Sequence, residues 1–304
     1  MRVITLGSGS TQTGKSFLAA NLGVALAQRG MRCCLVDLDL ASADLHLMTG
    51  CLNPQRTVAA LLRGRILSLA EASVPVPGCD GLRLIPGPRE TLRSSSLSER
   101  EIARLGSEIL RLPAEIVLVD LEAGEGQQLL DLFLMGDYQW VVSTTSSASI
   151  DAASGLQRLA RLRRTARGSA SGQSHRPRIY TSLDDLVKDM SALRDERLPA
   201  KDGMAVCSGV VLNRTGAGDE DLETRLLEGI LSTGHAVDDT PIMAEIPEDP
   251  AVAASIRALE PLCLRDPQAP AVRAIRQLAC SLVEELTAGA ASEGLAMPSE
   301  PALV

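Results

Sequence analysis

A run of eight residues near the N-terminus has the composition and spacing of a phosphate-binding loop. The pattern G-x-x-x-x-G-K-[ST] is matched at every fixed position by Gly9-Ser10-Thr11-Gln12-Thr13-Gly14-Lys15-Ser16. The glycines of such a loop let backbone N–H groups turn toward phosphate oxygens, and the N-terminus of the next helix adds partial positive charge. Lys15 would reach the outer phosphates of a nucleoside triphosphate, and the Ser16 hydroxyl would bind Mg²⁺. The sequence therefore predicts a nucleotide site that extends from Gly9 to Phe17.

Acidic residues that follow predicted strands are candidates for the metal side of this site. Asp120 ends an apolar run, and Asp37 and Asp39 end another. Because a phosphate loop needs a carboxylate partner for Mg²⁺ at the end of a neighbouring strand, Asp120 is predicted to be that partner. One of Asp37 and Asp39 is expected to lie near Mg²⁺ through water, and the other to orient an attacking water. Beyond Asp120, the N–H of Gly124 is expected near the terminal phosphate.

These residues need a scaffold of alternating strands and helices. A strand, a helix and a second strand follow one another in the first 37 residues, which is a βαβ unit and implies parallel strands. The same alternation continues along the chain and predicts an α/β fold, with a mostly parallel sheet and helices on both faces. Strands are expected at 2–6, 33–36, 82–85, 116–120, 140–144 and 210–213. Helices are expected at 16–29, 57–62, 98–110, 150–163, 180–193, 222–231 and 271–286.

The expected domain organisation is simple. Residues 1–288 are predicted to form one P-loop NTPase domain, with an inserted loop and helix at 164–205. The insertion begins with small, polar and basic residues that are typical of a loop. Residues 289–304 are rich in Ala, Gly, Ser, Glu and Pro and are expected to be a disordered tail.

Composition excludes several classes of protein. The 304 residues carry 38 acidic and 30 basic side chains, a net charge of -8, and only two Phe, two Tyr and one Trp. Nucleic acid is therefore not expected as a partner, because the chain has few aromatic side chains to stack on bases and no excess of positive charge to bind phosphates. The N-terminal residues do not resemble a secretory signal, and no run approaches the roughly 18 apolar residues of a membrane span. The seven cysteines form no C-x-x-C pair, so buried free thiols and a cytoplasmic location are expected.

With these motifs in hand, the chain resembles the MinD/ParA family of P-loop ATPases. Further similarities lie at Leu212-Asn213-Arg214, from Ile246 to Val252 and from Pro261 to Leu278, and the last two favour the MinD/FlhG branch. The resemblance implies that the ligands are ATP and Mg²⁺. It gives catalytic roles to Lys15, Asp39 and Asp120, and metal-binding roles to Ser16, Asp39 and Asp120. It also implies that Asn213 contacts adenine, and that Arg214, Pro247 and Asp249 lie beside the base.

The loop departs from the family pattern at three positions. The family has a lysine where this chain has Ser10, and two glycines where it has Thr11 and Gln12. That lysine crosses a face-to-face dimer and contacts the partner's nucleotide. A comparable cation, the arginine finger, contributes on the order of 10³–10⁵ in rate. The chain is therefore expected to bind nucleotide and, if it hydrolyses ATP, to do so slowly.

Two functions remain open at this stage. The first is a slow Mg²⁺-dependent ATPase that acts as a nucleotide-switched spatial or assembly regulator, with an ATP-dependent homodimer and an unidentified protein partner. The second is a nucleotide-binding module that docks a partner without hydrolysis. An amide-forming ligase and a metal carrier are weaker alternatives, since no acid-substrate pocket or paired cysteines can be assigned. The helix expected at 271–286 has mixed charge, so it is predicted to dock on the domain rather than anchor the chain to a membrane.

Overall fold

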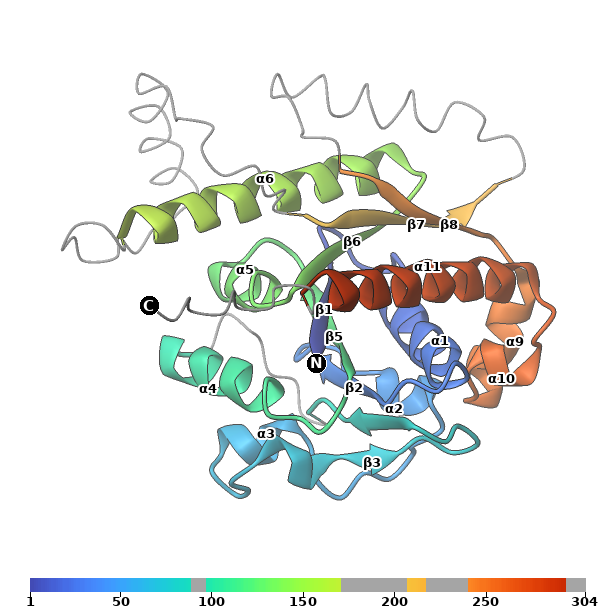
Figure 1. Ribbon diagram of the computed structural model, residues 1–304, viewed down its shortest axis with the longest axis horizontal. Coiled ribbons are helices and arrows are strands. Elements are labelled where there is room, and N and C mark those ends of the chain that lie inside the picture. Colours follow the sequence, from blue (N-terminus) through green and yellow to red (C-terminus); the bar gives the residue numbers. More distant parts are fainter. Residues whose placement is uncertain (89–96, 171–206, 217–239, 294–304) are drawn as a thin grey trace, which may run out of the picture.

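The computed structural model describes residues 1–88, 97–170, 207–216 and 240–293. Figure 1 shows the strands and helices along the chain. The strands are β1 (Arg2–Ser8), β2 (Cys33–Leu38), β3 (Val74–Pro75), β4 (Leu82–Ile85), β5 (Ile116–Ala123), β6 (Tyr138–Thr144), β7 (Gly209–Thr215) and β8 (Ile242–Pro247). The α-helices are α1 (Lys15–Ala27), α2 (Leu45–Met48), α3 (Val58–Leu62), α4 (Glu99–Ile109), α5 (Gln127–Phe133), α6 (Ser147–Ala170), α9 (Pro250–Ala258), α10 (Leu262–Arg265) and α11 (Pro270–Glu293), and the 3₁₀ helix η1 spans Leu69–Ala72.

The described strands form one sheet in the order β3-β4-β2-β5-β1-β6-β7-β8. Every neighbouring pair is parallel except β3 and β4 at one edge, which confirms the mostly parallel sheet. Strand β1 lies between β5 and β6, so the loop that follows it opens at the middle of the sheet edge. This is the place where ligands bind in open α/β sheets.

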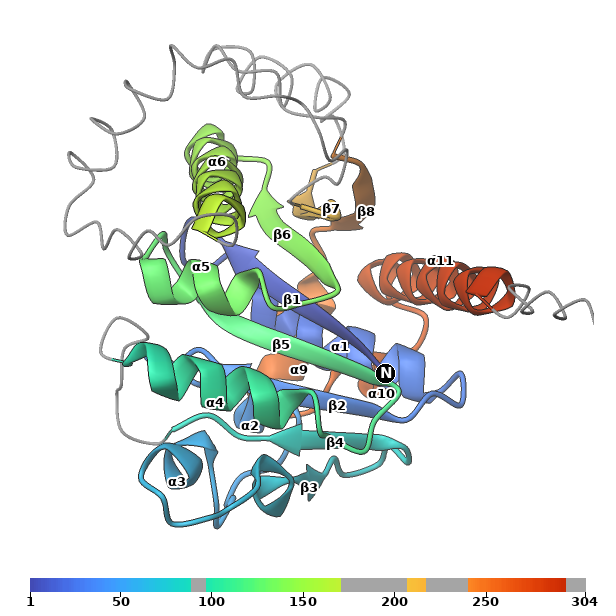
Figure 2. The ribbon, with the colours of Figure 1, turned by 60° about the vertical axis from the view of Figure 1, so that its left-hand side comes forward.

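Alternate side chains of each strand supply two separate cores. On β5, Ile116 and Leu118 face one core while Val117 and Val119 face the other. The first core is covered by α1 and α11, and the second by α4, α5 and α6. Figure 2 shows these two groups of helices on opposite sides of the sheet. Strands buried on both faces explain why the apolar runs in the sequence are nearly continuous.

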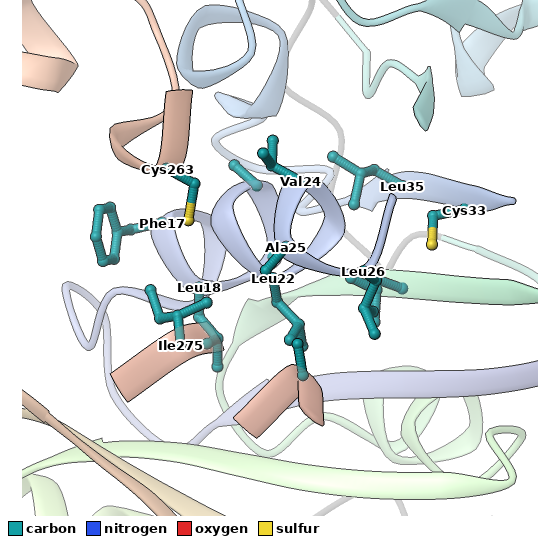
Figure 3. Close-up of a cluster of buried hydrophobic side chains, with 14 of the residues drawn as sticks. Phe17, Leu18, Leu22, Val24, Ala25, Leu26, Cys33, Leu35, Cys263 and Ile275 are labelled. Atoms are coloured by element: carbon teal, nitrogen blue, oxygen red, sulfur yellow. The ribbon is translucent and has the colours of Figure 1, made fainter. Parts of the chain in front are cut away.

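Helix α11 docks on the domain, as its mixed charge predicted. Its buried side chains include Val272, Ile275 and Leu282, which belong to the same core as α1. Figure 3 shows Ile275 on the side of α1 that carries Leu18 and Leu22. The seven cysteines are free, and all except the half-exposed Cys280 are buried, as expected. No helix in the described part of the chain is long and apolar enough to cross a bilayer.

Two predicted boundaries are wrong. Helix α6 continues to Ala170, so residues 164–170 are helical rather than the start of an inserted loop. Helix α11 continues to Glu293, so residues 289–293 do not belong to a disordered tail. In both cases the apolar pattern ends before the helix does, so the pattern placed the boundary too early. The rest of the insertion to residue 205, the helices expected at 180–193 and 222–231, and residues 294–304 lie outside the described residues.

Candidate functional site

The loop of residues 9–14 joins the end of β1 to the start of α1. Helix α1 begins at Lys15 after Gly14, which has φ of 89° and supplies no side-chain cap. The first turn of α1 contains no acidic side chain. Because the first N–H groups of a helix have no partner within the helix, they remain available for an anion. The backbone of the loop thus offers N–H groups that a phosphate could bind, and phosphate binding there stays a prediction.

Glycine is required at both ends of this loop. A Cβ atom on Gly9 would collide with the carbonyl oxygen of Ala152 in α6, because the helix backbone passes directly against the loop. At Gly14, the left-handed φ and the amide nitrogen of Asn213 both exclude a side chain. Between them, Gln12 adopts φ of 61° without being glycine. A left-handed backbone costs a non-glycine residue roughly 1–2 kcal/mol, so the departure from the family pattern at Gln12 leaves local strain.

Lys15 is buried and engaged within the loop. Its ammonium donates a hydrogen bond to the Ser8 hydroxyl at 3.0 Å, and that hydroxyl donates to the carbonyl oxygen of Ser10 at 2.7 Å. Only 6% of Lys15 is exposed. Positive charge in so buried a place is stabilised by the carboxylates described below. The sequence did not mark Ser8 as a site residue, because it precedes the motif and resembles any other strand residue.

Asp120 lies within β5, three residues before the strand ends, and is fully buried. Its neighbours in register are Leu6 of β1 and Asp37 of β2. Neither of its carboxylate oxygens accepts a hydrogen bond of normal length from the described residues. Burial raises the pKa of Asp120 to about 7, while the Lys15 ammonium and the Ser16 hydroxyl act in the opposite direction. A buried carboxylate with unsatisfied oxygens beside a serine hydroxyl is the arrangement expected of an Mg²⁺ ligand.

Asp37 and Asp39 have different surroundings. The Asp37 carboxylate accepts backbone hydrogen bonds from the N–H groups of Asp39 and Leu45, both at 3.2 Å. It is fully buried, and burial together with the charge of Asp120 raises its pKa well above the usual value. Asp39 is half-buried and accepts a hydrogen bond from the Ser42 N–H at 2.9 Å. Burial raises the pKa of Asp39 too, and Lys15 opposes that rise. Asp37 thus holds the loop backbone, and Asp39 is the more accessible carboxylate near Lys15.

Asp44 adds a further carboxylate to the same edge. Burial raises its pKa, and the Ser16 hydroxyl and Lys15 oppose the rise. One of its oxygens is buried without a hydrogen-bond partner among the described residues. Asp44 is not among the site residues that the sequence predicted. Its proximity to Ser16 depends on the turn between β2 and α2, which residue spacing does not reveal.

The carboxylate and hydroxyl oxygens around the loop are of the kind that binds a magnesium ion. Across the described residues, no three His, Cys, Asp or Glu side chains converge to hold a metal by themselves. Mg²⁺ in nucleotide sites is instead held by one or two protein oxygens together with phosphate oxygens and water. Ser16 and Asp120 could supply those protein oxygens, because the Asp120 carboxylate is buried with no hydrogen-bond partner among the described residues.

The turn after β5 lies against the loop. The N–H of Gly124 donates to the carbonyl oxygen of Ser8 at 3.0 Å. The sequence placed this N–H near the terminal phosphate. In the structure the residue lies beside the loop, but its N–H is already paired with the strand. A phosphate contact at Gly124 would require this bond to open.

The four residues expected around the base have different surroundings. Asn213 is buried near the C-terminal end of β7, and its amide nitrogen donates to the carbonyl oxygen of Thr13 at 2.8 Å. Arg214 is exposed, with φ of 59°. Pro247 ends β8 and pairs in register with Thr215. The carboxylate of Asp249 accepts hydrogen bonds from the N–H groups of Ala251 and Ala271, at 2.9 and 3.2 Å. Asp249 therefore caps α9 and holds the start of α11.

The structure thus brings together one group of predicted residues and separates another. Lys15, Ser16, Asp39 and Asp120 lie at one edge of the sheet around the loop, joined by Asp37 and Asp44. Asn213 touches the loop from the other side. The side chain of Phe17 is buried in the core, so only its backbone N–H is available to a ligand. The contact between Asn213 and Thr13 was not foreseen.

Comparisons with known proteins identify the family. The model of the CobQ/CobB/MinD/ParA nucleotide binding domain matches residues 4–262. An uncharacterised ATP-binding protein of Methanocaldococcus jannaschii is 25% identical over 280 residues, which is 92% of this chain and 87% of that protein. The antiactivator FleN of Pseudomonas aeruginosa is 31% identical over 132 residues, covering 43% of this chain and 46% of FleN.

Solved structures share the fold. The cell division ATPase MinD of Pyrococcus furiosus superposes with a TM-score of 0.64 at 22% identity, covering 94% of this chain and 99% of that one. The septum site-determining protein MinD of Pyrococcus horikoshii, complexed with Mg-ADP, gives a TM-score of 0.63 at 21% identity, covering 92% and 95%. The family match, the parallel sheet and the loop after β1 agree. The chain belongs to the MinD/ParA family of P-loop ATPases, within the CobQ/CobB/MinD/ParA group of nucleotide-binding domains.

Proposed function

We propose that this chain binds ATP with Mg²⁺ at the loop of residues 9–17 and hydrolyses it slowly, as the switch of a spatial or assembly regulator. The observation that carries the proposal is the buried carboxylate of Asp120. Its oxygens lack partners among the described residues and lie near the Ser16 hydroxyl and Lys15. Leaving such a group unsatisfied costs stability, so a bound cation is the simplest reason for its presence.

Each side chain of the site has its own role in binding and hydrolysing ATP in this proposal. Lys15 leaves the Ser8 hydroxyl and donates to the outer phosphates, which offer stronger charge-assisted hydrogen bonds. Ser16 and Asp120 hold Mg²⁺, which when bound neutralises charge on the phosphates. Asp39 is the more accessible carboxylate near Lys15, and it orients the attacking water. The backbone N–H groups from Gly9 to Phe17 surround the phosphates.

The base lies on the side of β7 and β8 in this proposal. Asn213 and Arg214 come from the end of β7, and Pro247 from the end of β8. Asp249 acts through its two backbone caps, which fix the loop between β8 and α9. ATP is preferred to GTP here because the family resemblance, and the ATP-binding protein of M. jannaschii, favour adenine.

The regulatory role rests on relatives. FleN is described as an antiactivator, MinD proteins as septum site-determining proteins, and one solved structure is a MinC:MinD complex from Aquifex aeolicus. By analogy, the ATP form of this chain would form a homodimer or bind a protein partner, and hydrolysis would end that state. This part of the proposal is an inference from similarity rather than from the geometry of the site.

Three features of the loop favour a second function, nucleotide binding without hydrolysis. Ser10 removes the cation that the family uses across its dimer, and Gln12 keeps a strained backbone where the family has glycine. The Gly124 N–H is also paired with Ser8. These features favour a module that holds ATP without turnover and docks a partner in a fixed state.

Calorimetry and single-turnover kinetics separate these functions. MgATP should bind to the wild-type chain far more tightly than to Lys15→Ala, and binding should weaken when Mg²⁺ is removed. Hydrolysis above the level of Lys15→Ala, lost in Asp39→Ala, would support the ATPase. Gel filtration with ATP, ADP or no nucleotide then tests the dimer. Tight binding with neither turnover nor a dimer would favour the docking module, and absence of binding would refute both.

A further inference from the structure

The amide of Asn213 connects two parts of the site that are distant in sequence. Its nitrogen donates to the carbonyl oxygen of Thr13 at 2.8 Å, across a separation of 200 residues. Its oxygen accepts the N–H of Arg214 at 3.0 Å. The side chain is 5% exposed. Both ends of the amide are therefore engaged with backbone, and their orientation is defined by two hydrogen bonds.

The strand that carries Asn213 is held in place by a neighbouring strand on each side. In β7, Asn213 pairs in register with Thr144 of β6 and Ile246 of β8. Its backbone is thus held between two parallel neighbours at the end of the sheet. A hydrogen bond from such a position restrains whatever it reaches, and here it reaches the last turn of the loop before α1.

The approach of Asn213 to the loop is close enough to require a glycine. A Cβ atom on Gly14 would collide with the Asn213 amide nitrogen. The second glycine of the motif therefore has two reasons to be glycine, its φ of 89° and this contact. The contact is part of the packing of the loop rather than a chance approach of two surface groups.

The hydrogen bond sets the direction of a phosphate donor. The C=O of Thr13 and the N–H of Gly14 belong to one planar trans peptide, so they point in opposite directions. Holding the carbonyl toward β7 turns the Gly14 N–H away from β7. The motif assigns that N–H to the phosphates. The amide of Asn213 thus orients the loop before any ligand arrives.

We propose that Asn213 is a positioning residue for the triphosphate, acting on the loop through Thr13, in addition to any contact with the base. Each amide nitrogen has two hydrogens and each amide oxygen two lone pairs, so one donor and one acceptor site remain for adenine. Base recognition and phosphate binding are then coupled through one side chain. This inference rests on the proposed nucleotide site and adds to it a role for Asn213 that does not depend on the base.

The test uses a ligand without a base. Asn213→Ala should weaken binding of Mg-tripolyphosphate roughly tenfold, because a buried hydrogen bond and its orphaned carbonyl are lost. MgATP should lose at least the same factor. A residue that only reads adenine would leave tripolyphosphate binding unchanged while ATP binding falls, and that result would overturn the proposal. No change with either ligand would overturn it too.

A matched control and a ligand-free measurement complete the experiment. Asn21 is another buried asparagine, which donates to Phe17 and accepts from the Cys263 N–H without touching residues 9–14. Asn21→Ala should lower stability without changing the tripolyphosphate affinity. In the ligand-free chain, Asn213→Ala should speed amide hydrogen exchange at residues 9–14, and Asn21→Ala should not. If wild type binds neither ligand, the proposed function fails, and the exchange result alone decides whether Asn213 holds the loop.

Discussion

Replacing Asp120 with asparagine should make the ligand-free protein more stable at high pH while removing its metal ligand. The carboxylate is fully buried and its pKa is raised from 3.8 to about 7. From about pH 4 to about pH 7 the unfolded chain has released this proton and the folded chain retains it. Stability therefore falls as the pH rises through that window, and the penalty persists above pH 7.

The size of the effect follows from the shift. A tenfold change in proton affinity is about 1.4 kcal/mol, so moving the pKa of Asp120 from 3.8 to about 7 costs roughly 4 kcal/mol at alkaline pH. The asparagine amide would be buried with few partners, which costs about 2 kcal/mol at any pH. The variant should thus be about 2 kcal/mol more stable than wild type near pH 8, and slightly less stable near pH 4.5.

Urea unfolding at the two pH values, without nucleotide or metal, measures this difference. Asp131→Asn is the matched control, because Asp131 is also buried but bonds Arg163 through both oxygens, at 2.8 and 2.9 Å. It should be less stable than wild type at both pH values. A stability difference for Asp120→Asn that does not change with pH would refute the reasoning. Calorimetry of the same variant should show that Mg²⁺ no longer strengthens nucleotide binding.

Three other substitutions test separate parts of the structure. Lys15→Ala should lower MgATP affinity about a hundredfold or more in calorimetry, because the charge-assisted bonds to phosphate are lost. Trp140→Phe should change stability to urea by less than about 1.5 kcal/mol, since the lost packing is offset by removal of a buried indole N–H without a partner among the described residues. Asp249→Ala should cost about 2 kcal/mol in thermal unfolding, because two helix starts lose a cap, whereas the exposed neighbour Glu248→Ala should have little effect.

Much of the scaffold could be predicted because burial leaves a strong pattern in the sequence. Strands such as β5 are covered on both faces, so nearly every residue from Ile116 to Val119 must be apolar. The loop of residues 9–16 has a fixed pattern that depends on its own local geometry. Both patterns involve residues that are close together in the sequence, so they can be recognised without knowledge of the fold.

The parts that were missed depend on contacts or on weak local patterns. Strand β8 is only partly buried and contains Glu245, so its residues do not form a strong apolar run. Helix α6 was expected to end where its apolar spacing fails, but it continues to Ala170. The roles of Ser8 and Asn213 follow from hydrogen bonds to the loop, and the bond from Asn213 joins residues 200 positions apart. No spacing pattern in a sequence relates residues that are so far apart along the chain.

The close approach of Gly9 to Ala152 has a mechanical consequence. Helix α6 has 24 residues, so it is roughly 36 Å long, and Ala152 lies near its first end. On the same end, Glu125 of the turn after β5 contacts Gly155. The helix is also fixed further along its length, because Leu156 and Leu159 are buried in the second core and the Arg163 guanidinium donates two hydrogen bonds to Asp131 of α5. A displacement of the loop at Gly9 would therefore be resisted by the packing of the whole helix, so the rigidity of the loop comes from the core as well as from its own hydrogen bonds.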